Sequence, residues 1–351
     1  MSEHALSKRH LAYKLGLGAA LAVGLAALAH YAQRHIAVDK KTSRPARKEK
    51  TDAPVATGEP GPGLRLGQIL IPVAHPDTAC ALTQVASALG AGEIPSELIA
   101  LKVVVAPPGD PLDEARRYRL AMRENYGEAL SRAAAWAAEQ GVPLRTEVQV
   151  SPDVATGILS FAHTLPDLGL IILGWRGPVS RRRVRHSINQ KIVSHAKTHV
   201  AVLHERGLQS IRRVLVPVGW GPHARLGLRL AERLAISSRA AVTVLRVLPP
   251  VGEVDWESER AALVQLLGAE APALRYDTEL RLARGPAVVS AILEEARREP
   301  YDLLIIGASD EWWVRTWLFG AIPDQIAEQA PCSVLLVRRY EPGLLEGNRG
   351  L

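Results

Sequence analysis

Two short apolar stretches, QILIPV at residues 68–73 and RVLVPV at residues 213–218, decide how this chain folds. Each stretch is rich in isoleucine, leucine and valine, without the alternation of polar and apolar residues that marks a strand with one solvated face. Each is followed by a turn and then by a helical pattern, at residues 80–89 in one case and 224–234 in the other. The pattern predicts a strand buried on both faces and then a helix, as in a parallel sheet.

This strand pattern recurs along the chain, and the recurrences form two copies of one domain. The matching apolar stretches are residues 98–105 and 241–247, residues 170–174 and 303–307, and residues 200–203 and 334–337. Helical patterns between the strands give repeated strand–helix units, and the period is too long for a solenoid. We therefore expect two tandem α/β domains at residues 66–205 and 210–340, each a doubly wound, Rossmann-like parallel sheet of about five strands. Residues 341–351 form a tail.

The net charge of +7 would by itself suggest nucleic acid or an anionic membrane as a partner. The distribution of the charged residues along the chain helps to decide between these two partners. Residues 1–65 hold 11 basic and five acidic residues, whereas the remaining 286 residues hold 32 and 31. Within that remainder, residues 174–213 form a basic patch with Glu205 as their one acid. Because the domains are nearly neutral and the basic clusters lack interleaved aromatics, we expect no binding of nucleic acid.

The N-terminal part contains an apolar stretch that indicates a membrane anchor. Residues 15–29 carry no polar side chain, and the stretch from Leu11 to Ala32 reaches the roughly 20 residues that a helix needs to cross a bilayer. Seven Lys and Arg follow between Arg34 and Lys50, which favours a cytoplasmic position for the rest of the chain. We expect one N-terminal transmembrane helix, a single pass with the C-terminal domains in the cytoplasm.

The anchor is assigned to residues 1–36, and residues 37–65 read as a basic linker rich in Pro and Gly. Two other interpretations of the apolar stretch stay open. A secretory signal peptide is suggested by the Ala-x-Ala pattern at residues 27–29, and a buried helix by the length of the strictly apolar part.

Three motifs resemble those of the universal stress protein family. They are the Ile-Pro-Val strand at residues 71–73, the GWRG turn at residues 174–177 and the closing APCSVLLV at residues 330–337. The resemblance covers residues 66–340 and implies two domains of the universal-stress-protein type. The second copy, with IGASDEWWVRTWLFG at residues 306–320, is similar to the paired stress domains at the cytoplasmic ends of some amino-acid permeases. That similarity implies a preceding membrane helix, which this chain also has by its sequence.

The resemblance also implies a nucleotide site in the first copy. ATP-binding members of the family have Gly-x-x-Gly, nine residues, and then Gly with Ser or Thr, because small residues let backbone N–H groups approach phosphate oxygens. Gly174 and Gly177 match, whereas Ser187 and Ile188 stand where the glycine and the hydroxyl are expected. A shift by one residue, to His186 and Ser187, restores the hydroxyl but not the glycine.

The loop between these positions is rich in arginine, which can neutralise phosphate. A solvated basic loop, or one that faces the membrane, is the alternative. We expect ATP or another adenine nucleotide in the first domain only, and no metal. The predicted nucleotide-binding residues are Val73, Ala74, Gly174, Arg176, Gly177, Arg183, His186, Ser187 and Ile188.

The second copy departs further from the family pattern. Gly307 is present, but Asp310 replaces the second glycine and would repel phosphate, and Gly320 is not followed by a hydroxyl. We therefore predict a degenerate second site at these three residues. Both copies also lack the acidic residue that family members carry after the first strand, since Ala74 and Gly219 stand in its place.

Three tryptophans stand close together near the end of the second copy. Large aromatics are favoured as anchors at interfaces, so Trp312, Trp313 and Trp317 are predicted to dock a partner. Packing onto their own domain or between the two copies is the alternative. The two copies are expected to form a pseudo-dimer within the chain, and a homodimer of two chains stays open.

Catalytic signatures are missing from the sequence. It contains neither a hydrolase elbow, nor a Walker lysine loop, nor the HExxH motif, so we expect no enzyme and name no catalytic residue. His195, His199 and His204 lie near one another, but only Glu205 could join them as a ligand, so we expect structural roles.

Taken together, the features predict a membrane-tethered tandem universal stress protein that senses a nucleotide or regulates a partner, with a transporter as the candidate partner. Two alternatives stay open. One is a structural module that binds no ligand and docks a membrane partner, and the other is a slow ATP hydrolase.

Overall fold

The computed structural model describes residues 64–105, 127–175, 187–249, 253–274, 278–285, 287–308 and 321–342. The predicted anchor from Leu11 to Ala32, the linker and most of the tail lie outside these residues. Within the described part of the chain, the helices fall short of the length and apolarity needed to cross a bilayer.

The first domain is a chain of alternating strands and helices. Its elements are β1 (Gln68–Pro72), α2 (Pro76–Gly90), β2 (Glu97–Val105), α4 (Glu128–Glu139), β3 (Leu144–Ser151), α5 (Val154–His163), β4 (Leu168–Trp175), α7 (Ile188–His195) and β5 (His199–His204). Proline in the first turn of α2 suits that position, because its missing N–H would have no partner within the helix. Asp153 caps the start of α5, because its carboxylate accepts a hydrogen bond from the N–H of Thr156.

The second domain repeats this alternation. Its elements are β6 (Arg213–Pro217), α8 (Pro222–Ser238), β7 (Ala241–Leu248), α9 (Trp256–Glu270), β8 (Glu279–Arg284), α11 (Val288–Arg298), β9 (Leu303–Gly307), α12 (Ala321–Gln329) and β10 (Ser333–Arg338). α8 also has proline in its first turn, and α9 begins at Asp255, whose carboxylate accepts from the N–H groups of Glu257 and Ser258.

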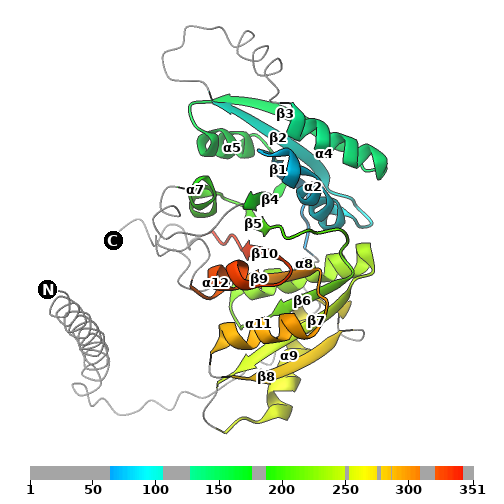
Figure 1. Ribbon diagram of the computed structural model, residues 1–351, viewed down its shortest axis with the longest axis vertical. Coiled ribbons are helices and arrows are strands. Elements are labelled where there is room, and N and C mark those ends of the chain that lie inside the picture. The colour runs from blue at the N-terminus through cyan, green and yellow to red at the C-terminus, as the bar shows by residue number, and fades with distance from the viewer. Residues whose placement is uncertain are drawn as a thin grey trace, which may run out of the picture. The chain divides into compact units, whose positions relative to one another are not determined.

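All ten strands lie in one sheet, in the order β3-β2-β1-β4-β5-β10-β9-β6-β7-β8 (Figure 1). Each domain contributes five parallel strands in the same relative order, with the first strand between the second and the fourth. The prediction of two tandem, doubly wound parallel sheets is confirmed. The two sheets meet at β5 and β10, which run antiparallel and pair Val334 with His204 and Arg338 with Val200.

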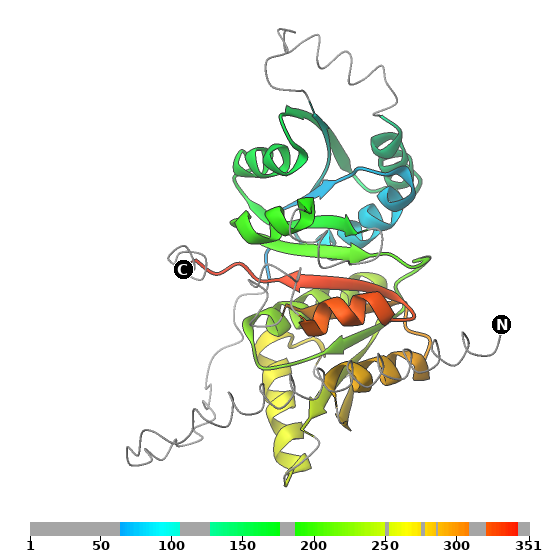
Figure 2. The ribbon, with the colours of Figure 1, turned by 60° about the vertical axis from the view of Figure 1, so that its left-hand side comes forward.

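Helices cover both faces of this sheet (Figure 2). Successive side chains of a strand enter the cores on opposite faces of the sheet. Ile69 and Ile71 belong to the core beneath α2, α4, α8 and α9, whereas Leu70 belongs to the core beneath α5, α7, α11 and α12. All three side chains are fully buried. This burial on both faces is the reason why the strands read as continuous apolar runs.

Two arginines connect the domains beside the β5–β10 pair. Arg338 is buried, and its Nη2 donates to the carbonyl oxygens of Ala196 (2.9 Å) and Thr198 (2.8 Å) just after α7. Arg206 reaches the other way, and its Nη2 donates to carbonyl oxygens of Ala327 and Glu328 near the end of α12. The two arginines thus supply donors for carbonyl groups at or just after the C-terminal ends of α7 and α12.

Two histidines hold the chain that follows β10. The Nδ1 atom of His199, at the start of β5, accepts from the N–H of Tyr340, and that of His223, in α8, accepts from the N–H of Arg339 (both 3.0 Å). Burial, together with Arg339 and Arg338, lowers the pKa of His199 to about 4. His199 is therefore neutral near pH 7, as an accepting Nδ1 requires.

Replacing His199 by Asn is expected to make the stability less sensitive to acid. An unfolded histidine binds a proton below about pH 6.5, whereas folded His199 does so only near a pKa of about 4. Between these values the unfolded state binds more protons, so the free energy of unfolding falls as the pH is lowered. The free energy of unfolding should be measured with urea at neutral pH and at about pH 5. Between these two pH values it should fall by on the order of 1–2 kcal/mol more in the native chain than in the variant. Equal losses would contradict this assignment.

Candidate functional site

The candidate site of each domain lies where its strand order reverses. Between β1 and β4 in the first domain, and between β6 and β9 in the second, neighbouring strands lead to helices on opposite faces. In folds of this kind, ligands bind beyond the carboxyl ends of the strands at such a switch point. Beyond these ends, Val73 and Val218 each donate one further backbone hydrogen bond, to Leu101 and Leu245 (both 2.9 Å). Ala74 and Gly219 follow directly and are exposed.

In the first domain, the start of α7 is fastened to the end of β4. The side-chain amide of Asn189 donates to the carbonyl oxygen of Gly174 (3.0 Å), and the hydroxyl of Ser187 caps the helix by accepting from the N–H of Gln190 (3.1 Å). A helix N-terminus offers backbone N–H groups and positive potential to an anion. The structure thus brings Gly174, Ser187 and the exposed Ile188 together at one edge of the sheet.

A half-buried cation recurs at the same place in both domains, and the sequence analysis missed it. Pro72 lies opposite Leu101 and Pro217 opposite Leu245, so Lys102 and Arg246 occupy equivalent positions one residue further along. Lys102 Nζ donates to the carbonyl oxygen of Ala74 (3.2 Å), and Arg246 Nη1 to that of Val218 (3.5 Å).

Partial burial lowers the pKa of the Lys102 ammonium. The signal was available in the sequence, because LKV at residues 101–103 and LRV at residues 245–247 place a charge inside an otherwise apolar strand. Burying a charge at such a position costs free energy unless the charge is paired or hydrogen-bonded.

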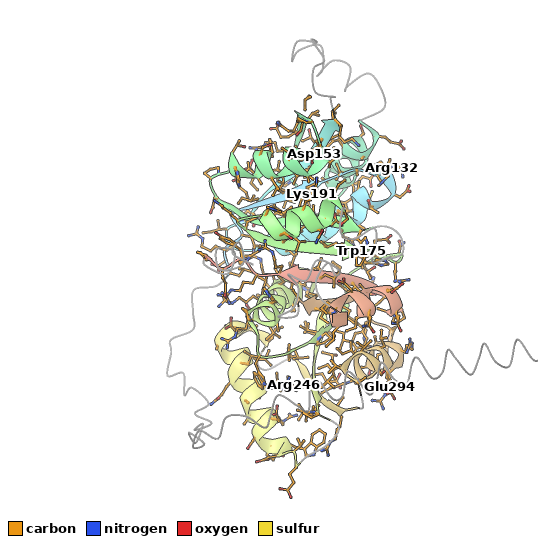
Figure 3. The ribbon with its side chains drawn as sticks, turned by 90° about the vertical axis from the view of Figure 1, so that its left-hand side faces the viewer. Arg132, Asp153, Trp175, Lys191, Arg246 and Glu294 are labelled. Atoms are coloured by element: carbon orange, nitrogen blue, oxygen red, sulfur yellow. The ribbon has the colours of Figure 1, made fainter. Side chains whose placement is uncertain are left out.

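The second domain has a pocket of about 280 Å³ at its switch point, lined by residues at the ends of β6, β7 and β9. The guanidinium of Arg246, labelled in Figure 3, lies 4.8 Å from the centre of the Trp220 ring. The pocket is otherwise mainly apolar and includes Gly307, predicted for the degenerate site. Its lining consists of Pro217, Val218, Gly219, Trp220, Gly221, Ala224, Leu245, Arg246, Val247, Val288, Ile292, Ile306, Gly307, Ala308, Ile322 and Pro323.

Gly307 has a structural reason to be glycine. A Cβ atom there would lie 2.5 Å from the carbonyl carbon of His223 and 2.6 Å from the nitrogen of Ala224, both backbone atoms of α8. A Cβ atom on Gly174 would instead meet the side chain of Leu82 at 3.3 Å. The glycine at the end of β9 therefore lets α8 approach the sheet, in addition to lining the pocket.

Several predicted residues lie outside the described part of the chain. The structure places Val73, Ala74, Gly174, Ser187, Ile188 and Gly307 at the carboxyl ends of the strands or at the start of α7. The positions that it does not describe are Arg176, Gly177, Arg183, His186, Asp310, Gly320, Trp312, Trp313 and Trp317.

The three histidines considered as metal ligands have other contacts. His195 Nδ1 is hydrogen-bonded to the carbonyl oxygen of Lys191 (2.8 Å), and His204 packs edge-on against Trp175 with ring centres 5.3 Å apart. His199 binds the chain after β10, as described above. Across the described ranges, no three His, Cys, Asp or Glu side chains gather as a metal site would require.

A pair of doubly wound domains, each with a switch point in its strand order, defines the class of this protein, and comparison identifies the family. The model of the universal stress protein family matches residues 66–204 and 210–338, so the chain belongs to that family. Among curated proteins, none matches the chain significantly.

Three solved structures of universal stress proteins match this chain. A universal stress protein from Archaeoglobus fulgidus DSM 4304 is 16% identical and covers 80% of this chain and 98% of its own, with a TM-score of 0.57. A universal stress protein in complex with cAMP is 22% identical and covers 36% of this chain and 97% of its own, with a TM-score of 0.32. One from Archaeoglobus fulgidus in complex with dAMP is 20% identical and covers 36% and 98%, with a TM-score of 0.29.

Proposed function

We propose that this tandem universal stress protein is a regulatory module that binds an adenine nucleotide in its first domain. The observation that supports this most is the presence of two sources of positive potential beyond the carboxyl ends of the neighbouring strands β1 and β4. The start of α7 is hydrogen-bonded to Gly174 at the end of β4, and the ammonium of the half-buried Lys102 contacts the carbonyl oxygen of Ala74 just after β1. Backbone N–H groups at a helix start and a lysine ammonium are common partners of phosphate.

The chemistry of this site favours recognition through phosphate. Ala74 offers no carboxylate to the ribose hydroxyls, so the nucleoside part would be held by shape and the backbone. The proposal assigns binding only, with no catalytic step and no metal. A bound nucleotide would then act by stabilising the first domain in its liganded form.

Membrane tethering is a separate part of the proposal and rests on sequence alone. The apolar stretch from Leu11 to Ala32, with its basic C-terminal flank, would hold both domains at the cytoplasmic face, where a transporter is the partner we favour. Removal of residues 1–36 should move the protein from the membrane pellet to the supernatant of a cell lysate. A full chain that is soluble without detergent would contradict the tether and leave the nucleotide site standing.

Nucleotide binding is tested by calorimetry of the full chain with ATP, ADP, cAMP and dAMP, the last two being the ligands present in the related complexes. Replacing Lys102 by Met is expected to weaken binding about tenfold or more, because one charge-assisted contact is lost. Lys197, exposed between α7 and β5 at the other end of the strands, provides a matched Lys→Met control that should bind normally.

Equal affinity of both lysine variants would remove Lys102 from the site, and no binding of any nucleotide would overturn the proposal. In that case the module that only docks a partner becomes the better explanation. Steady release of ADP from bound ATP would instead favour the slow hydrolase.

A further inference from the structure

The pocket of the second domain has a chemistry unlike that of a phosphate site. Its described walls consist of valine, isoleucine, leucine, alanine, proline and glycine residues, together with Trp220 and Arg246. Arg246 is the one charged side chain among the described lining residues. A pocket of this kind buries an apolar body and fixes its orientation through a single charged group.

The guanidinium of Arg246 is held in place but retains donors. Its side chain is only 18% exposed and lies against the face of Trp220, which restricts its position. Nε forms an ion pair with Glu259 (3.4 Å) and Nη1 donates to the Val218 carbonyl (3.5 Å), and both distances are long for a guanidinium. Since a guanidinium has five N–H donors in a planar fork, Arg246 can still bind a carboxylate.

The volume limits the size of the ligand. About 280 Å³ lies just below the range of roughly 300–1,000 Å³ for small-molecule pockets, which favours a small ligand. One cation matches one negative charge, whereas a di- or triphosphate would bring several charges into a mainly apolar pocket.

We propose that the second domain binds a compact organic monoanion, a carboxylate on an apolar body, with the carboxylate on Arg246 and the body among Val288, Ile292 and Ile306. The site is separate from the nucleotide site proposed for the first domain and does not depend on it. Lys102 and Arg246 occupy equivalent positions in the two domains. Each domain would then use the cation at this position to recognise a different ligand.

The first test is calorimetry of the full chain with 3-phenylpropionate and octanoate, each compared with its uncharged primary amide. We expect a Kd below about 1 mM for at least one carboxylate and at least tenfold weaker binding of its amide. Replacing Arg246 by Met should weaken carboxylate binding at least tenfold. The exposed Arg260 on α9 gives a matched Arg→Met control that should leave binding unchanged.

A second pair of variants keeps Arg246 in place. The space around Gly219 is open, so a side chain there meets no neighbour within 4 Å. Replacing Gly219 by Asp should repel the carboxylate and weaken binding at least tenfold, whereas Asn, of nearly the same shape, should have little effect.

Three results would overturn the proposal: no binding of either carboxylate, equal affinity for acid and amide, or equal affinity of the Gly219→Asp and Gly219→Asn variants. Displacement of a bound carboxylate by AMP at similar concentrations, unaffected by replacement of Lys102, would also overturn it, because the pocket would then be a nucleotide site. Failure of nucleotide binding in the first domain would leave these measurements unchanged.

Discussion

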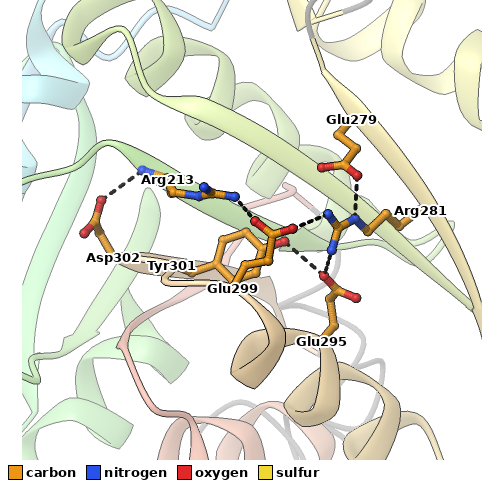
Figure 4. A network of polar contacts seen from close by, with 7 residues as sticks. All are labelled: Arg213, Glu279, Arg281, Glu295, Glu299, Tyr301 and Asp302. Atoms are coloured by element: carbon orange, nitrogen blue, oxygen red, sulfur yellow. Dashed lines mark hydrogen bonds and ion pairs between the residues drawn. The ribbon is translucent and has the colours of Figure 1, made fainter.

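Replacement of Arg281 by Met is expected to lower the free energy of unfolding by about 3–5 kcal/mol, the usual cost of removing one partner from a buried ion pair. Arg281 on the edge strand β8 lies at the centre of a network of charged groups (Figure 4). Its Nε donates to Glu279 (2.7 Å), its Nη2 to Glu299 (2.6 Å), and its Nη1 to Glu295. Glu295 is buried, so it would be left as a charge without its main partner.

The rest of the network joins the edge strand to the interior. Glu299 also pairs with Arg213 at the start of β6, and the hydroxyl of Tyr301 donates to Glu295 (3.1 Å). Hydrogen bonding to Arg281 lowers the pKa of Glu279, and the pairing raises that of Arg281. Since a lowered carboxyl pKa stabilises the fold above the pKa of the unfolded state, acid should weaken this contact as the pH falls.

Urea unfolding followed by circular dichroism measures the effect. The exposed Arg297 of α11 supplies a control, and its replacement by Met should change the stability by less than about 0.5 kcal/mol. Adding Glu295→Gln to the Arg281 variant should restore part of the loss, because it removes the unpaired charge. A loss below about 1 kcal/mol in the Arg281 variant would show that the network contributes little.

Replacement of Gly307 by Ala is the second change with a large expected effect, a loss of about 3 kcal/mol or more. The new methyl group would lie within 2.6 Å of two backbone atoms of α8, at His223 and Ala224, and backbone atoms cannot rotate away. The helix must shift, which costs more than the usual range of about 1–3 kcal/mol for an overpacked core. Because Ala224 and Gly307 both line the pocket, the shift should also weaken ligand binding there.

The equivalent change in the first domain is the control. Gly174→Ala brings the methyl group against the end of the Leu82 side chain, which can adjust, so we expect a loss of about 1 kcal/mol. Thermal unfolding of the two variants side by side gives the comparison. Similar melting temperatures would contradict the role assigned to Gly307.

The sequence was sufficient to predict the strands and the duplication, because burial on both faces leaves unbroken apolar runs such as residues 69–71. It also indicated where β1 and β4 end, since a turn follows the stretch at residues 68–73 and the GWRG motif at residues 174–177 was read as a turn. It did not show how the two sheets meet. That contact depends on Arg206 and Arg338, which reach carbonyl groups more than a hundred residues away.

The candidate site was only partly predictable, because it too is formed by residues that are far apart in the sequence. Lys102 and Arg246 stand inside strands that read as core, so a search of loops for phosphate ligands passes over them. In the second domain the sequence pointed to the pocket only through Gly307. Its walls were not predicted, because they are ordinary apolar residues, such as Val288 and Ile322, whose convergence is a property of the fold.

The antiparallel pairing of β5 with β10 has a consequence for how the two domains could diverge. Only residues 205–212 separate β5 from β6, so the partner surface is always present at a high effective concentration, whatever the amount of protein in the cell. An assembly of two identical chains would carry every substitution twice. Covalent linkage instead lets one domain change while its neighbour stays the same. A single molecule can then carry a lysine at one position and, at the equivalent position of the other domain, an arginine beside a tryptophan.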